Sequence, residues 1–220
     1  MAVQFAEVSE LFTVIFNAMG AGASVNHLHF QGLPKKYFRF PIDDKQQLVA
    51  DSGPGTLPNF RVRREIVRSF DLSSLASLKV NLYRICGWPL TSIFEFREDS
   101  ADVQGKSTGK PEADVFSDIS SVVMHFVQKL QERNVAHNLV ISNDRLPGKG
   151  SRCTRVLLAI RHFNSSTNSS HDMQVASMET VGWWIVCDRK HFDSIKSENL
   201  DKMLASTSVA ESLLRELGLC

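Results

Sequence analysis

The sequence predicts an α+β protein built on a mainly antiparallel sheet with flanking helices. Short runs of alternating, β-branched residues recur along the chain, and turns containing glycine or proline separate them. Residues 119–130 differ, because their apolar side chains recur at the spacing of one helix face. With 220 residues and a hydrophobic content of 43%, the chain can bury a sizeable core.

The first predicted element is a β-hairpin with a glycine-rich tip. Residues 11–17 alternate and include β-branched side chains, which predicts a strand. Residues 18–23 contain two glycines and predict a turn, after which residues 24–32 alternate again and predict the second strand. The proline-containing stretch 34–58 has few periodic segments, so we expect a long connection there.

The later elements follow from the same two periodicities. The clearest helix covers residues 119–130, where Ser117 or Asp118 can cap the start, and a second helix is predicted over 199–217. The polar segment 99–111 and the Ser/Asn-rich segment 164–170 predict loops. Further strands are predicted over residues 78–85, 92–97, 137–142, 155–161 and 181–187.

Charge and composition narrow the classes of partner. A net charge of +1 provides no strong field toward nucleic acid or membrane. The basic run 61–64 has Glu65 beside it, so we interpret it as a solvated strand or helix face. No stretch approaches the roughly 20 apolar residues that span a bilayer, and the first residues lack the pattern of a secretory signal. We therefore expect a cytoplasmic protein that binds neither nucleic acid nor membrane.

The segment from Asn26 to Gln31 carries the most informative chemistry. Side chains alternate between the two faces of a strand, so His27, His29 and Gln31 would line one face, about 6 to 7 Å apart. Leu28 and Phe30 would point the other way and anchor the strand in the core. A neutral imidazole can attack an activated phosphorus, and an amide can hold a phosphoryl oxygen without adding a competing base.

Small residues precede this segment, between Asn17 and Ser24. Glycines such as Gly20 and Gly22 let backbone N–H groups turn toward an anion and let phosphate oxygens approach closely. Ser24 adds a hydroxyl two residues before Asn26. A nucleophile beside an anion cradle is what phosphoryl or nucleotidyl transfer requires.

Spacing alone leaves two other interpretations open. A histidine in a strand is often only a hydrogen-bonded structural residue, and a His-x-His pair is also half of a zinc site. The remaining histidines are scattered along the chain, and glutamine is a poor zinc ligand, so nucleotidyl chemistry is favoured over metal binding. The scattered histidines are His125, His137, His162, His171 and His191.

The hairpin resembles the active-site hairpin of the histidine-triad superfamily. The string from Gly22 to Gln31 has the His-x-His-x-Gln pattern of its transferase branch, where the hydrolases have a third histidine. It is most similar to the GDP-L-galactose and GDP-D-glucose phosphorylases. Weaker similarity to that family covers residues 78–95, 134–142 and 179–192. The resemblance implies a histidine-triad-like sheet.

The resemblance also implies roles for individual residues. His29 would be the nucleophile that accepts the nucleotidyl group, His27 would orient it, and Gln31 would hold a non-bridging oxygen of the α-phosphate. These residues require no metal or organic cofactor. The residues expected to bind the phosphates or the nucleotide are Asn17, Gly20, Gly22, Ser24 and Asn26.

The implied reaction is phosphorolysis of a GDP-hexose, GDP-glucose or GDP-galactose, to GDP and hexose 1-phosphate through a guanylyl-histidine. The partners would then be the GDP-hexose and inorganic phosphate. One alternative is another nucleotidyl transfer, such as phosphorolysis of a dinucleoside polyphosphate. The other is a non-catalytic nucleotide-binding remnant.

The hairpin stands near the start of the chain, whereas family members have a long segment before it. We therefore divide the chain into a partial catalytic domain, 1–60, with the hairpin and its connection, and a C-terminal α+β part, 61–220. We expect N-terminal strands to be missing, so that strand 11–16 lies at an unpaired edge. Such an edge predicts a homodimer or a poorly soluble chain, and the missing pocket wall predicts weak binding of guanine nucleotides.

Overall fold

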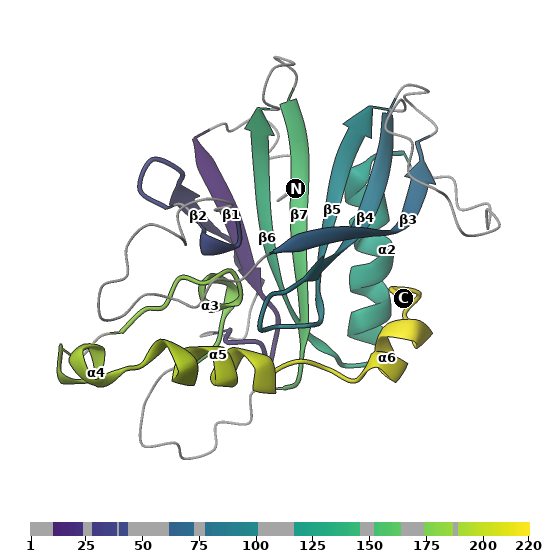
Figure 1. Cartoon of the computed structure of the whole chain (residues 1–220). Helices are drawn as coiled ribbons and strands as arrows, with labels where there is room; N and C mark the ends of the chain where they lie inside the picture. Colours follow the sequence, from purple (N-terminus) through teal and green to yellow (C-terminus); the bar gives the residue numbers. More distant parts are fainter. Residues whose placement is uncertain are drawn as a thin grey trace.

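The computed structural model describes residues 11–23, 28–38, 40–43, 62–72, 78–100, 117–145, 152–163, 174–186 and 189–220. The described strands form one seven-stranded antiparallel sheet in the order β2-β1-β6-β7-β5-β4-β3, with helices on both faces (Figure 1). The predicted α+β class is confirmed. The strands are β1 Phe12–Asn17, β2 Gln31–Pro34, β3 Arg63–Asp71, β4 Leu78–Cys86, β5 Ile93–Ser100, β6 Ala136–Arg145 and β7 Arg152–Arg161.

One long helix, α2 (Ile119–Glu132), covers one face of the sheet (Figure 1). Asp118 caps its start by accepting a hydrogen bond from the Ser121 backbone N–H at 2.8 Å, which confirms one of the two predicted caps. The helix buries its apolar stripe, from Ile119 to Leu130, against β1 and β3 to β7. Each such side chain contributes about 1.5–3 kcal/mol of hydrophobic stabilisation.

Shorter segments cover the opposite face of the sheet. Ile15, Val140 and Leu157 on this face pack with apolar residues of the short helices and of the 3-10 turn η1. The helices α3 and α5 lie across this side of the sheet (Figure 1). These segments are η1 Pro41–Asp43, α3 Ser177–Thr180 and α5 Ser197–Ser206. The other two short helices in the described part of the chain are α4 Arg189–Ser194 and α6 Glu211–Glu216, and α6 buries Leu214 in the core on the α2 face.

The strand predicted over 181–187 is wrong, because its described part forms a turn. Residues Val181, Gly182 and Trp183 donate their backbone N–H groups to carbonyls of Met178 and Glu179, which closes α3 and leaves no strand ladder. Gly182 has φ +98, a conformation that favours glycine, and a Cβ there would lie 2.9 Å from Pro41. Cys187 lies outside the described residues.

The predicted C-terminal helix 199–217 is interrupted. Ser208 forms an antiparallel bridge with Arg161 at the end of β7, and the His162 N–H donates to the Thr207 carbonyl at 2.9 Å. These sheet contacts take the chain out of helical geometry between α5 and α6. The sequence therefore predicted helical structure in this region, but local spacing could not show this break.

The expectation that β1 is an unpaired edge is wrong. β1 pairs with β6 on one side and with β2 on the other, and both Val14 and Ile15 are buried. The edge beside it is β2, a strand of four residues that ends at Pro34. A short edge strand with proline offers little backbone for pairing with another chain. The basic run predicted as a solvated face enters β3, where Arg63 is exposed and Arg64 is largely buried.

Candidate active site

The predicted hairpin forms, but its second strand is shorter than predicted. Gln31 pairs with Ile15 at the start of β2, whereas the described residues 28–30 before it lie outside any strand. The strand predicted over 24–32 is therefore confirmed only at its end. The predicted site residues Ser24, Asn26 and His27 lie outside the described residues.

The alternation of side chains around Gln31 is preserved. Paired residues of an antiparallel ladder point to the same face, so Gln31 shares the face of Ile15, which α3 and α5 cover. Phe30 packs against Phe16 on the α2 face, with ring centroids 5.3 Å apart. However, Leu28 is 70% exposed and Phe30 38% exposed, so the prediction that they anchor the strand in the core is wrong. They stand beyond the paired ladder, at the edge of the sheet.

His29 precedes β2 and is partly buried, while Gln31 is exposed. Their separation by one residue places them on the same side of the extended chain that enters β2. An imidazole and an amide in this arrangement can act on one phosphoryl group. Their roles in catalysis stay predictions.

The turn that follows β1, residues 18–23, requires glycine at two positions, both for its backbone conformation and for packing. Gly20 has φ +73 and Gly22 has φ +84, which side chains rarely adopt. A Cβ on Gly20 would lie 2.1 Å from the Phe163 ring, and one on Gly22 would lie 2.7 Å from the Ala176 Cβ. These contacts explain both glycines without a ligand, and their predicted role in phosphate binding stays a prediction.

Asn17 joins three segments below this turn. Its Oδ1 accepts hydrogen bonds from Asn138 Nδ2 at 2.7 Å and from the Ser177 N–H and Oγ at 2.9 and 2.6 Å. The carbonyl oxygen is thus fully used between β1, β6 and α3. If Asn17 contacts a phosphate as predicted, it must do so through its Nδ2 amide group.

Arg161 continues this buried network from the end of β7. Its guanidinium donates to Asn138 Oδ1 at 3.3 Å and to the carbonyl of Val175. Burial lowers the pKa of Arg161 to about 10, with Glu179 opposing the shift, so the group stays charged at neutral pH. Burial likewise raises the pKa of Glu179, whose carboxyl accepts from the Ala176 N–H at 2.9 Å. The segment that supports the glycine turn is therefore held by buried polar contacts.

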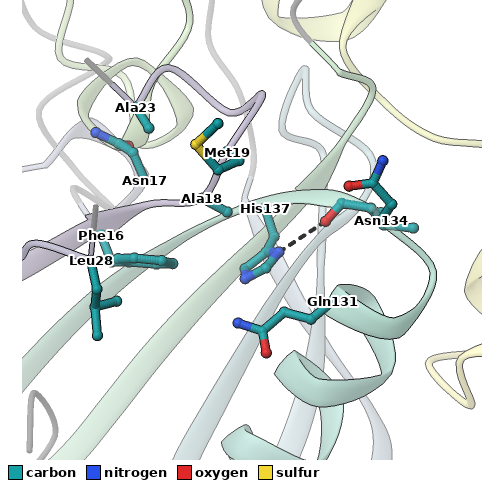
Figure 2. Close-up of a pocket in the computed structure, with 10 residues that line it drawn as sticks. Phe16, Asn17, Ala18, Met19, Ala23, Leu28, Gln131, Asn134 and His137 are labelled. Atoms are coloured by element: carbon teal, nitrogen blue, oxygen red, sulfur yellow. Dashed lines mark hydrogen bonds between the residues drawn. The ribbon is translucent and has the colours of Figure 1, made fainter. Parts of the chain in front are cut away.

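A cavity of about 280 Å³ opens beside the glycine turn (Figure 2). The turn and Leu28 form one wall, and the end of α2 with the start of β6 forms the other. Phe16 and His137 lie on its inner side, with ring centroids 6.0 Å apart. The cavity is lined by Phe16, Asn17, Ala18, Met19, Ala23, Leu28, Gln131, Asn134, Val135 and His137.

The polar wall of the cavity depends on how α2 ends. Asn134 has φ +52, and the N–H groups of Asn134 and Val135 donate to the carbonyls of Gln131 and Leu130. This is the Schellman arrangement, with asparagine in the left-handed position. It turns the chain sharply into β6 and brings His137 next to the last turn of the helix.

His137 was only one of the scattered histidines in the sequence. Its Nδ1 lies 3.0 Å from the Val135 carbonyl, and Nε2 has no hydrogen-bond partner among the described residues. Burial lowers its pKa, opposed by the bond to Val135. Alternation with Leu139 and Ile141 could have indicated that His137 is buried. No sequence signal links it to Gln131 and Phe16.

A second buried polar cluster lies on β3, β5 and β7. Glu95 is fully buried, and its carboxylate contacts Arg64 at 2.8 Å, Arg97 at 3.6 Å and Arg155 at 3.9 Å. Arg97 and Arg155 are directly opposite in the ladder, where like charges destabilise a sheet. Glu95 offsets that repulsion. No local sequence pattern indicates this cluster, because its members are far apart in the chain.

The fold and hairpin together define an α+β protein with an open antiparallel sheet and a His-x-Gln segment at one edge. Residues 65–218 match the model of the GDPGP1-like family, C-terminal domain. This match covers well over half of the chain, which therefore belongs to this family of GDP-hexose phosphorylases and is related to nucleotidyl-transferring enzymes. The match begins within β3, so the hairpin lies before it.

No curated protein and no solved structure matched the chain. In the part of the chain that the structure describes, no helix has the length and apolar character needed to cross a membrane.

Proposed function

We propose that the protein catalyses phosphorolysis of a GDP-hexose, GDP-glucose or GDP-galactose, to GDP and hexose 1-phosphate. The observation that carries the proposal is the family match over residues 65–218. The sequence also supports it, since the predicted nucleophile His29 and the amide of Gln31 follow within a few residues of the glycines predicted to cradle a phosphate.

The reaction proceeds in two displacements. An imidazole nitrogen of His29 attacks the α-phosphorus, the bond from that phosphorus to the bridging oxygen breaks, and hexose 1-phosphate leaves with the electron pair. Inorganic phosphate then attacks the guanylyl-histidine, which breaks the P–N bond, forms GDP and restores His29. Gln31 holds a non-bridging oxygen in both steps, and His27 orients His29.

Phosphate dependence tests the reaction. The purified chain should release GDP from GDP-glucose or GDP-galactose only when phosphate is present. Equal release of nucleotide without phosphate would identify a hydrolase instead. A dinucleoside polyphosphate tested in the same assay distinguishes the alternative nucleotidyl transfer.

Trapping the intermediate tests His29. Incubation with a GDP-sugar labelled in the guanylyl group, without phosphate, should label the chain in an acid-labile and alkali-stable bond. His29→Ala should abolish the label and lower turnover by several orders of magnitude. His125→Ala on α2 is the matched control and should label normally. Undiminished labelling of His29→Ala would remove His29 from this role.

A further inference from the structure

Arg161, Asn138 and Asn17 form a line of hydrogen bonds that runs from the end of β7 to the end of β1, and its direction is fixed at Arg161. A guanidinium has donors only, so Arg161, which lies 3.3 Å from the Asn138 side chain, must face the amide oxygen of Asn138. The other end of that amide then carries only hydrogens. The donor-only neighbour therefore distinguishes the two orientations of the Asn138 amide, which have the same shape.

The direction passes from Asn138 to Asn17. The two Asn138 amide hydrogens go to Asn17 Oδ1 and to the Ala21 carbonyl, each at 2.7 Å. The backbone N–H of Ser177 donates to the same Asn17 oxygen at 2.9 Å. A reversed Asn17 amide would set its own hydrogens against both of these donors, so one orientation is selected.

The consequence is an oriented donor on Asn17. With Oδ1 held by Asn138 and Ser177, the Nδ2 group is at the outer end of the amide, and it makes no hydrogen bond to the described residues. The nitrogen points away from His137 at the start of β6 (Figure 2). Asn17 is half-buried, so this end of the side chain is open to a ligand.

The sheet sets this donor in line with His29. The register of β1 and β2, continued by two residues beyond their ladder, puts His29 opposite Asn17. Phe16 and Phe30 are one position beyond the ladder, and their ring centroids are 5.3 Å apart, so the two segments stay adjacent there. Opposite residues share a face, which is also the face of Gln31.

We propose that Arg161 and Asn138 are positioning residues, which hold the Asn17 amide so that its N–H₂ group donates to an oxygen of the phosphoryl group that His29 attacks. A donor that is oriented before the reaction stabilises the developing charge without reorganising. Neither Arg161 nor Asn138 touches the substrate. Because the phosphoryl group is that of the GDP-hexose, this role rests on the proposed function.

Asn138→Asp tests the direction of the line. The carboxylate has nearly the same size and still accepts from Arg161, but it cannot donate to Asn17. In the phosphorolysis assay, kcat should fall about 10- to 100-fold with little change in KM, the size of one hydrogen bond to a charged group. Asn81→Asp is the matched control, because Asn81 is a buried asparagine of β4 that accepts from Ser69, and it should keep the wild-type kcat. Equal kcat values in the two variants would overturn the positioning role.

Asn17→Asp separates positioning from folding. It keeps an oxygen that accepts from Asn138 and Ser177, and it replaces only the outer N–H₂ group. This variant should fold and should lose at least as much kcat as Asn138→Asp.

Two substitutions at Arg161 test whether its donor-only character matters. Lysine only donates, whereas glutamine can donate or accept and would let the Asn138 amide reverse. Arg161→Lys should therefore retain more kcat than Arg161→Gln. Equal kcat values would show that Arg161 does not act by orienting Asn138, because a role in packing alone would not distinguish the two.

Side-chain amide NMR tests the orientation without turnover. In the full chain labelled with ¹⁵N-asparagine, the Asn138 hydrogens should exchange slowly with solvent, because both are bonded and the side chain is buried. The Asn17 hydrogens should exchange fast and shift when GDP is added. The signals are assigned by their loss in Asn138→Asp and Asn17→Asp.

The two proposals fail in different ways. Fast exchange at Asn138, or an Asn17 signal that GDP leaves unchanged, would overturn the positioning role and leave phosphorolysis unaffected. The expected signals without phosphate-dependent turnover would overturn the proposed function alone.

Discussion

Glu95 is the residue on which the charge balance of the sheet depends. It is the carboxylate shared by Arg64, Arg97 and Arg155, whose side chains are 15%, 29% and 13% exposed. Tyr83 also holds Arg97 in place. Its hydroxyl accepts a hydrogen bond from the Arg97 guanidinium at 3.1 Å, and the guanidinium carbon lies 4.7 Å from the centroid of the Tyr83 ring. The pairing of buried charges costs desolvation, but removal of one partner costs more, since the others then repel each other.

We therefore predict that Glu95→Gln lowers the free energy of unfolding by about 3 kcal/mol, measured by urea denaturation. Glu211→Gln is the matched control. The Arg84 guanidinium donates two hydrogen bonds of 2.8 Å to the Glu211 carboxylate, which lowers the pKa of Glu211 to about 2. However, the Glu211 side chain is 44% exposed. A surface pair contributes about 1 kcal/mol or less. Equal losses in the two variants would contradict the prediction.

His137 predicts a pH dependence of stability. Burial lowers its pKa in the folded state below the value of about 6.5 that it has when unfolded. The stability that the neutral, buried His137 contributes is fully present above its unfolded pKa. It is lost as the pH falls from that value to the folded pKa, because in this range the unfolded chain binds a proton that the folded chain does not.

The wild-type chain should consequently lose more stability between about pH 7.5 and pH 5 than His137→Gln does. Denaturant unfolding of both proteins at several pH values measures the difference. Parallel stability curves for the two proteins would show that His137 does not titrate differently on folding.

At the scale of elements, α2 holds its face of the sheet through Phe126. The Phe126 ring lies 6.0 Å from that of Phe70 on β3 and 5.4 Å from that of Phe96 on β5, so one helix position connects two strands. Phe126→Ala should cost about 3–5 kcal/mol. Met124→Ala on the same helix should cost less than about 1 kcal/mol, because Met124 is 47% exposed. Thermal and urea unfolding of the pair measure this contrast.

The glycine turn offers a second test at this scale. Gly22 and Gly218 both have positive φ, +84 and +76, so alanine is strained at either position by about 1–2 kcal/mol. Only Gly22 has a neighbour within contact, the Ala176 Cβ at 2.7 Å, whereas Gly218 has nothing within 4 Å. Gly22→Ala should therefore destabilise the protein more than Gly218→Ala in urea unfolding. If the two losses are equal, the contact with Ala176 is not rigid.

At the scale of the whole molecule, the hairpin and the later segments share one sheet. β1 pairs with β6 from Val14–Ile141 to Asn17–Asn138, and Asn17 bonds to Ser177 on α3. The division at residue 60 proposed from the sequence would cut this sheet. The fragment 61–220 would expose the edge of β6, with Val140 and Ile141 uncovered.

We predict that the fragment 61–220, made alone, associates or precipitates, because an exposed apolar strand edge pairs with other chains. The 220-residue chain, whose β6 edge β1 covers, should remain smaller in size-exclusion chromatography with light scattering. A monomeric fragment with cooperative unfolding would instead support an independent C-terminal domain.

Local periodicity by itself determined much of the fold. Apolar spacing predicted β1, α2, β4 and β7 close to their observed bounds, and Asp118 as a cap, since these depend on residues adjacent in the chain. The hairpin could also be predicted, because two alternating segments flank a turn that contains Gly20 and Gly22. The sequence alone indicated the α+β class and the candidate residues His29 and Gln31.

The tertiary structure decided the features that depend on distant residues. The turn at Val181 and the break before α6 arise from hydrogen bonds that compete with a strand or a helix. Arg161 is buried because Asn138 and Val175 receive its hydrogen bonds. The cavity joins Phe16, Gln131 and His137 from three separate elements, and no local spacing encodes that meeting. Burial of His137 Nε2 is a property of the packed molecule, since desolvation depends on all the neighbours that fold around it.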